Sequence, residues 1–476
     1  MQVQRSAFLQ EAKPLLRTLI QKLSEKYGYA SVLAADTRSK QYHVANTGVF
    51  AGEDELFTRR GFVLKVYDGR SYGEYSFTHI DEDAIPAIVA EVQGRLMPLS
   101  GRLPEGLSLS EYGRISDEPA VLLKSTEYEV HPDEKGDEAI LAALNAIRDD
   151  AKGRDERIID CNIDYEYQEI HKLFLSPNRD LEQNLLWSDC SFYVMCPKED
   201  DIVGCSDGVS DLAGVEVLDK LHSRLDNAVK GALELIDSEP ITPGEYECVC
   251  TPAVTGLIAH EAFGHGVEMD MFVKDRAQAK KYVGEYVASP LITMHDGAAV
   301  QRNTGSFFFD DEGVLSHDTV IIEKGVLKRG ISDIQSAMHL GTEPTGNGRR
   351  ESFERKAYTR MTNTYFEPGD ATLEDMIASV EDGFLLDNPS SGMEDPKNWG
   401  IQCMVNMARE IKHGKLTGRV FSPIVLTGYV PDLLKSISMV SRDFELDGSG
   451  GCGKGWKEWV KVSAGGPCIK ARIRLG

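Results

Sequence analysis

Apolar residues near the start of the chain recur at intervals of three and four positions. They lie at Phe8, Leu9, Ala12, Leu15, Leu16, Leu19, Ile20 and Leu23. Such spacing places the side chains on one face of an α-helix, and that face is best explained by packing against a core. The segment has no continuous apolar run of the kind found in a secretory signal peptide. We therefore expect an amphipathic helix over about residues 8–23 and no signal peptide.

The remainder of the first half mixes strand and helix patterns. Within residues 61–77, Asp68-Gly69 separates two runs of alternating apolar and polar residues, which predicts a β-hairpin. The periodicity predicts strands at about 30–36, 41–48, 61–77, 157–175 and 190–197, and helices at about 83–98, 137–152 and 211–237.

A domain boundary is expected after the helix that ends near Asp237. Pro240, Pro243 and Gly244 follow that helix within a short segment, and such residues mark linkers. The second half is richer in strand patterns and glycine turns, with a meander at about 309–330 and a helix at about 372–383. The patterns predict an α+β fold in two domains. These are an N-terminal mixed helix and strand domain, residues 1–238, and a strand-rich C-terminal metal-binding domain, residues 239–476.

Charge limits the classes of partner. The 476 residues include 76 acidic and 52 basic ones, giving a formal net charge of -24 and a pI near 4.9. A surface this acidic repels phosphate backbones and anionic lipid. We therefore expect no nucleic-acid partner and no membrane partner.

No stretch of the sequence reaches the length of about 18 apolar residues that a membrane-spanning helix needs. The expected location is cytoplasmic.

The nine cysteines do not form an obvious disulfide framework. Their number is odd, and the chain shows no secretory context. Most are expected to be small buried hydrophobic residues. Cys248 and Cys250 alternate in a strand-like segment and so face one side, but a C-x-C pair alone is weak evidence of a metal site.

The candidate chemistry lies in the sequence His260-Glu261-x-x-x-His265. Thr251 followed by Pro252 is typical of a helix start, so the motif is expected on a helix. Histidines five positions apart on an ideal helix are separated by about 140°, which is too far for one metal. Either a π-bulge absorbs the extra residue, or the helix ends at Gly264. The alternative is two unrelated surface histidines on a regular helix.

A catalytic zinc site needs a third protein ligand and one open position. Cys452 is the candidate, because glycines on both sides let the backbone approach a metal. The alternative is a free cysteine in a flexible loop. The same segment, Gly448 to Lys454, resembles a phosphate-binding loop. However, Gly455 replaces the Ser or Thr that binds magnesium, and a strand pattern follows where such a loop requires a helix.

Longer segments surround these residues: PGEYECVCTPAVTGLIAHEAFGHGVEMD, GSFFFDDEGVLSHDTVIIEKGVLKRGI, TGNGRRESFERKAYTRMTNTYFEPGD and LDGSGGCGKG. Together they resemble the TldD/PmbA family of peptide-maturation metallopeptidases, and its TldD branch in particular. The resemblance spans most of the chain and is strongest from about Pro243 onward. Two features depart from the family: WKEWVKVSAGGP after the cysteine loop, and His295 where a small or aliphatic residue is expected. Both bear on substrate preference.

The resemblance implies a zinc ion (Zn²⁺) held by His260, His265 and Cys452. It also implies two α+β domains and a dimer that encloses the active sites, either a homodimer or a heterodimer with a related subunit. The implied substrates are unfolded or extended peptides and proteins. With Glu261 as general base for the zinc-activated water, the predicted function is a zinc-dependent metallopeptidase.

Two other functions remain open at this stage. One is a non-catalytic peptide-binding scaffold with structural zinc, whose fourth ligand is Cys250 or Glu268. The other is a zinc amidase acting on a small-molecule conjugate. Further residues have open roles. Tyr365, Arg360 and His295 are candidates for oxyanion stabilisation, and the run Asp310, Asp311, Glu312 is either a solvated turn or support for the histidines.

Overall fold

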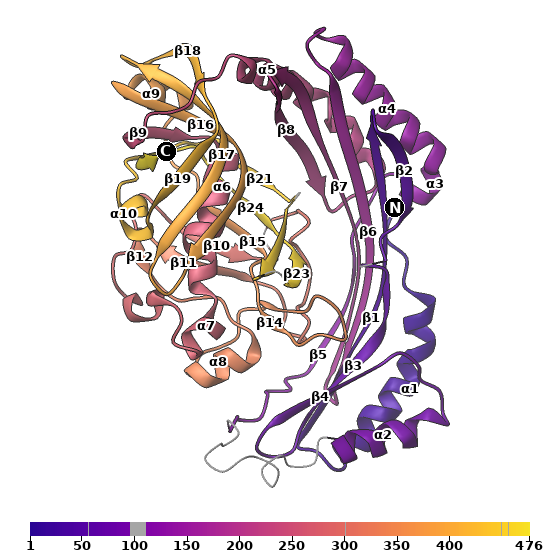
Figure 1. Ribbon diagram of the computed structural model, residues 1–476. Helices are drawn as coiled ribbons and strands as arrows, with labels where there is room; N and C mark the ends of the chain where they lie inside the picture. The colour runs from indigo at the N-terminus through magenta and orange to yellow at the C-terminus, as the bar shows by residue number, and fades with distance from the viewer. Residues whose placement is uncertain (56, 96–110, 300, 449, 456) are drawn as a thin grey trace.

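The structure is a computed structural model, and it describes residues 1–476 except 56, 96–110, 300, 449 and 456. We call residues 1–238 the N-terminal half and residues 239–476 the C-terminal half. The long curved sheet of the N-terminal half has helices on its outer face and the C-terminal half against its inner face (Figure 1). The mixed architecture confirms the α+β prediction. We keep the boundary between residues 238 and 239 as a proposal.

Within the described residues, eight strands of the N-terminal half form one sheet in the order β4-β3-β1-β6-β7-β5, with β2 beside β1 and β8 beside β7. The strands are β1 Tyr29–Ala45, β2 Gly48–Glu53, β3 Arg59–Tyr67, β4 Tyr72–Phe77, β5 Ala120–Ser125, β6 Asp160–Leu175, β7 Arg179–Lys198 and β8 Asp201–Asp211. The helices are α1 Ala7–Ser24, α2 Ala84–Arg95, α3 Pro132–Lys135, α4 Asp137–Gly153, η2 Val215–Lys220 and α5 His222–Ile236.

The first helix has the predicted amphipathic character. Ser6 caps it, since its Oγ accepts a hydrogen bond from the backbone N–H of Leu9 at 3.1 Å. Leu16 and Leu19 are fully buried against the sheet. The predicted hairpin is also present, because β3 and β4 pair antiparallel across the turn at Asp68-Gly69.

The described strands of the C-terminal half form two sheets and two hairpins. One sheet has the order β16-β9-β25-β19-β17-β18, with β20 beside β25, and β16 also pairs with β17, so five of its strands close on themselves. The other has the order β12-β11-β10-β15-β24-β21. The strands are β9 Gly244–Cys250, β10 Met294–Gly297, β11 Asp318–Glu323, β12 Val326–Leu327, β13 Gly348–Arg349, β14 Tyr358–Thr359, β15 Asn363–Phe366, β16 Asp382–Asp395, β17 Gly400–Lys412, β18 Lys415–Phe421, β19 Ile424–Tyr429, β20 Met439–Val440, β21 Glu445–Asp447, β22 Gly451–Lys454, β23 Lys457–Lys461, β24 Ser463–Gly466 and β25 Ile469–Leu475.

The helices of this half are short. They are α6 Pro252–Ile258, η3 Ala259–Gly264, η4 His265–Val267, α7 Met269–Val273, η5 Gln278–Tyr282, α8 Ile334–Leu340, α9 Leu373–Ala378 and α10 Val430–Lys435. Ile258, Ala262 and Phe263 are fully buried in the main core, so α6 and η3 run through the centre of this half. No helix in the described part of the chain is long and apolar enough to span a membrane.

Several element predictions are wrong in extent. The two strands expected at 30–36 and 41–48 are one continuous strand, β1, and the strand expected at 190–197 is the end of the longer β7. The helix expected at 211–237 is interrupted, because residues up to Asp211 pair with β7 and η2 precedes α5. The helix expected at 372–383 ends at Ala378, since Asp382 begins β16. Of the helix expected at 83–98, residues 96–98 lie outside the described residues.

Asp310, Asp311 and Glu312 are buried, so their interpretation as a solvated turn is wrong. Asp311 forms an ion pair with Lys172 of β6, and Glu312 forms one with Lys65 of β3. Burial of Asp311 and Glu312 is compatible with stability because each has an oppositely charged partner, while Asp310 accepts three backbone N–H groups. The run therefore attaches the C-terminal half to the N-terminal sheet.

Candidate metal centre

The helix that carries the histidines begins as the sequence predicts. Thr251 is the N-cap residue of α6 and Pro252 occupies its first turn. The Thr251 hydroxyl does not cap the helix, and instead donates to Asp387 Oδ1 of β16 at 3.1 Å. Gly256 brings α6 against β24, where an added Cβ would lie 2.8 Å from the backbone nitrogen of Gly465.

Replacing Gly256 by Ala is expected to destabilise the fold by about 1–3 kcal/mol, because the methyl group meets backbone rather than a movable side chain. Gly94→Ala in α2 is the control, since no described residue lies within 4 Å of an added Cβ there. Alanine is the better helix former, so that variant should be neutral or more stable by about 0.5–1 kcal/mol. Denaturant titration of both variants measures the difference. Equal midpoints would show that α6 can move away from β24.

The helix is irregular at the motif. Residues Ala259–Gly264 form a π-helical turn, and the His265 N–H donates to the His260 carbonyl five residues earlier. This turn absorbs the extra residue of the H-E-x-x-x-H spacing. The π-bulge prediction is confirmed, and the alternative of a regular helix with unrelated histidines is wrong.

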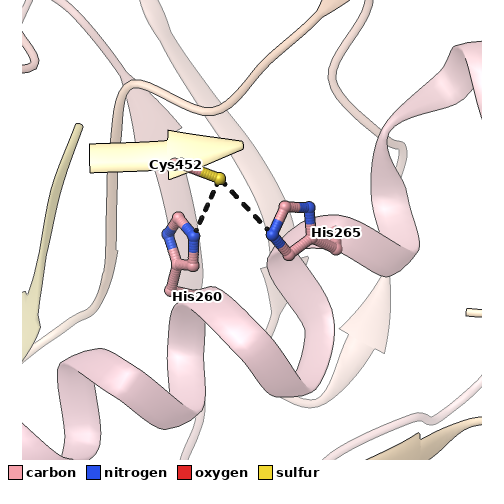
Figure 2. Close-up of side chains that lie close together, drawn as sticks. All are labelled: His260, His265 and Cys452. Atoms are coloured by element: carbon pink, nitrogen blue, oxygen red, sulfur yellow. Dashed lines mark hydrogen bonds between the residues drawn. The ribbon is translucent and has the colours of Figure 1, made fainter. Parts of the chain in front are cut away.

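The two histidines and the distant cysteine come together (Figure 2). Cys452 Sγ lies 3.3 Å from His260 Nε2 and 3.4 Å from His265 Nε2. The imidazole rings are 5.1 Å apart between centroids and nearly perpendicular, at 84°. We call these three residues the His-His-Cys cluster. Cys452 is buried on β22, so its interpretation as a free cysteine in a flexible loop is wrong.

The cluster fits a zinc ion. Its three potential ligand atoms lie within 4.8 Å of one another. Ligands at the usual zinc distances of about 2.0–2.3 Å in a tetrahedron lie about 3.5 Å apart, close to the observed S–N separations. Both Nε2 atoms face the sulfur rather than solvent (Figure 2). Among the described residues, the cluster contains three such groups, which would leave one position open.

The charges of the cluster favour the ligand form of the cysteine. Burial would raise the pKa of the Cys452 thiol, but His260 and His265 outweigh it and hold that pKa well below its usual value. Burial would lower the pKa of His265, but Cys452 and Glu268 outweigh it and hold that pKa well above its usual value. Thiolate is the form of cysteine that binds metals.

A charged network supports the cluster from behind. Arg360 Nη2 donates to Cys452 Sγ at 2.9 Å, and its Nε lies 3.3 Å from Glu268. Glu268 Oε2 lies 3.5 Å from His265 Nδ1 and accepts from Lys454 Nζ at 2.9 Å. A carboxylate on the outer nitrogen of a histidine fixes the orientation of the ring. Glu268 therefore orients His265, and Arg360 stabilises the thiolate.

Glu261 follows His260 directly in the π-helical turn that carries the first histidine of the cluster. It is half-buried, and its side chain packs against Gly392 of β16. Within the described part of the chain it makes no side-chain hydrogen bond or ion pair. A second carboxyl, that of Glu394, lies against the backbone of Gly266, and burial raises its pKa well above the usual value.

The other residues singled out from the sequence have different surroundings. His295 is bound between Asp318 and Glu367 and stacks on Tyr365, while Arg360 lies beside Cys452. Cys250 is the buried last residue of strand β9 and is not part of the His-His-Cys cluster. The segment after the phosphate-loop-like sequence is strand β23, as predicted.

The fold and the cluster thus define an α+β protein with a candidate metal centre on an interrupted helix. Residues 243–470 match the PmbA/TldA metallopeptidase C-terminal domain. A zinc metalloprotease TldD homolog from Saccharolobus solfataricus is 31% identical over 324 residues, covering 65% of this chain and 70% of that protein. A metalloprotease from Methanocaldococcus jannaschii is 35% identical over 239 residues, 50% of this chain and 52% of that protein. The chain belongs to the PmbA/TldD family.

Solved structures share the whole fold at low sequence identity. TldE from Thermococcus kodakarensis aligns with a TM-score of 0.73 and 19% identity, covering 97% of this chain and 100% of that chain. A Thermotoga maritima protein proposed to modulate a DNA gyrase aligns with a TM-score of 0.77 and 18% identity, covering 98% and 100%. In sequence, by contrast, the chain spans about half the length of most curated relatives it matches.

Proposed function

We propose that this protein is a zinc-dependent metallopeptidase. The observation that carries the proposal is the His-His-Cys cluster with Glu261 beside its first histidine. The names of the relatives, which include a zinc metalloprotease, support the choice of metal and reaction. A structural zinc normally has four protein ligands, and the three of this cluster therefore favour catalysis over a structural role.

His260, His265 and Cys452 would hold the ion. A zinc ion with an open position polarises a carbonyl group and lowers the pKa of water. The chain supplies the rest of the chemistry. Arg360 keeps the cysteine as thiolate through its contact at 2.9 Å, and Glu268 orients His265.

Glu261 is the proposed general base. Its carboxylate takes the proton from the attacking water and delivers it to the leaving amine nitrogen. The absence of side-chain partners within the described residues leaves both oxygens available for this transfer. Its neighbour Gly392 matters because a Cβ there would lie 2.5 Å from Glu261 Cγ, so the glycine leaves room for the side chain.

We further propose that the substrates are unfolded or extended peptides, that the chain acts in the cytoplasm, and that it works as a homodimer or with a related subunit. The likeness of the fold to TldE supports a two-subunit arrangement. The net charge of -24 repels the phosphate backbone of nucleic acids, so we propose no nucleic-acid partner.

These proposals predict selectivity for unfolded chains. A compact folded protein should be cleaved at least about 10-fold more slowly than its denatured form. In a folded substrate, only the small fraction of molecules that has opened exposes the segment to be cleaved. Cleavage rates on both forms, zinc content by mass spectrometry and mass by light scattering are measured on one preparation. Zinc-loaded protein that cleaves neither form would overturn the peptidase. Equal rates, or a monomer at micromolar concentration, would overturn the enclosed dimer.

A further inference from the structure

A cavity of about 420 Å³ lies between the N-terminal sheet and the C-terminal half. Its walls include Leu33, Ile170 and Trp187 of the sheet and Phe307, Phe353 and Trp459 of the other half. Cavities of about 300–1,000 Å³ with apolar walls and a few polar groups are typical ligand sites. This one has room for a short stretch of peptide.

The cavity adjoins the candidate metal centre. Gly451 and Val460 line it, and Val460 is the strand partner of Cys452 in the β22–β23 hairpin. On another side, Arg349 Nη1 donates to the Met361 carbonyl at 2.6 Å. The Met361 sulfur in turn packs against Gly264 of the histidine helix, since an added Cβ there would lie 2.3 Å from it. Lining residues therefore contact the segments that carry Cys452 and His265.

Most charged side chains that line the cavity are already paired. Lys172 binds Asp311, Arg350 binds Glu74 at 2.6 Å, and Lys461 binds Asp189. Two more charged groups of the lining form ion pairs, Arg59 with Glu354 and Glu351 with Arg355. Asp310 accepts hydrogen bonds from three backbone N–H groups, and Glu166 accepts one from the Ser39 hydroxyl. These groups are therefore satisfied within the fold.

Arg349 differs from them. Within the described residues its guanidinium forms no ion pair. It has the single bond to the Met361 carbonyl, and it lies 5.3 Å above the Phe307 ring. Burial lowers the pKa of Arg349 to about 10, so the group stays charged at neutral pH. Arg349 is half-buried, and a guanidinium without an ion pair gains from a ligand that supplies an anion.

We propose that this cavity binds a carboxylate of the peptide substrate, with Arg349 as its receptor and the aromatic walls packing the adjoining residue. An arginine with free N–H groups matches the two oxygens of a carboxylate. The carboxylate belongs either to an acidic side chain or to the C-terminus of the peptide. Arg349 is thereby a specificity residue, and the inference rests on the proposed peptidase function.

The test is a binding measurement on protein stripped of metal by a chelator, so that turnover does not interfere. Three acetylated peptides of equal length and otherwise identical sequence are compared by calorimetry. One carries Asp and an amidated C-terminus, one carries Asn and an amidated C-terminus, and one carries Asn and a free C-terminus. A charge-assisted bond is expected to make one of the two carboxylate peptides about 10- to 100-fold tighter than the neutral peptide. Which peptide gains identifies the source of the carboxylate.

Arg349→Gln is expected to remove that preference while leaving the affinity for the neutral peptide within about twofold. The matched control is Arg474→Gln, an exposed arginine of the C-terminal half that does not line the cavity and forms no ion pair in the described structure. Equal binding of the three peptides by the unmodified protein would overturn the proposal, whether or not the variant folds. So would a preference that survives in Arg349→Gln. Preference without turnover in the zinc-loaded protein would instead reject the peptidase and keep the site.

Discussion

Replacing Glu261 by Gln is expected to lower peptide turnover by about 10²–10⁴, or about 3–5 kcal/mol in barrier, while zinc content stays at the wild-type level. Glutamine is nearly isosteric and can still hydrogen-bond water, but it cannot accept a proton at neutral pH. The metal is retained because the potential ligands are His260, His265 and Cys452. Turnover and zinc stoichiometry are therefore measured on the same preparation.

The control for this variant is Glu285→Gln. Glu285 is an exposed glutamate of the C-terminal half, and its side chain makes no ion pair in the described structure. The Glu285→Gln variant loses the same charge without a change at the cluster, so its turnover should match that of the unmodified protein. A Glu261→Gln protein that binds zinc and turns over peptide normally would remove Glu261 from the mechanism. Loss of zinc in that variant would instead make Glu261 a ligand.

Local sequence patterns were enough to predict the elements whose buried residues recur at a regular spacing. The helix α1 follows directly from its apolar spacing, and Leu16 and Leu19 lie where that spacing places them. The hairpin β3–β4 follows from its turn residues. Both depend on neighbours in sequence, so a window of about 18 residues contains the information.

Elements that depend on distant pairing were predicted less well. β1 runs as one strand because Val32–Val44 pair without interruption with β6, although the exposed Arg38 and its half-buried polar neighbours interrupt the apolar pattern. β8 was not predicted, and its pairing with β7 carries residues up to Asp211 out of the expected helix. In both strands the partner, rather than the local sequence, sets the extent.

The site shows the same division. Irregularity at the motif could be predicted, because at this spacing a shared metal requires either a π-bulge or a helix that ends at Gly264, and the structure has the π-helical turn. Cys452 was a candidate from its flanking glycines, but only the resemblance to the family implied it as a ligand, since no local rule links it to His260, which is 192 residues away. The support by Arg360, Glu268 and Lys454 and the nearby carboxyl of Glu394 were not predicted, because these residues meet only in the folded chain.

Cys452→Ala is expected to remove most of the bound zinc. Loss of an outer hydrogen-bond partner typically weakens metal binding by about 10–100-fold, and loss of a direct ligand should exceed that, to at least about 100-fold. The imidazoles would then face a methyl group, and Arg360 would lose the thiolate it contacts at 2.9 Å. Mass spectrometry of the purified protein measures the metal. Wild-type zinc occupancy in the variant would show that the third ligand is another residue.

Cys250→Ala provides the control and decides between an open and a closed site. Cys250 was the candidate fourth ligand of a structural zinc, and its side chain lies in the core outside the His-His-Cys cluster. The Cys250→Ala variant should keep its zinc. Its free energy of unfolding should fall only by the amount lost with a small buried side chain. A chelator gives a second readout, because a ligand that binds only the folded state raises its melting temperature. Chelation should lower the melting temperature of the unmodified protein and of Cys250→Ala but leave that of Cys452→Ala unchanged. A fall of the same size in Cys452→Ala as in the unmodified protein would place the metal elsewhere. Zinc loss in both variants would make the site closed and structural.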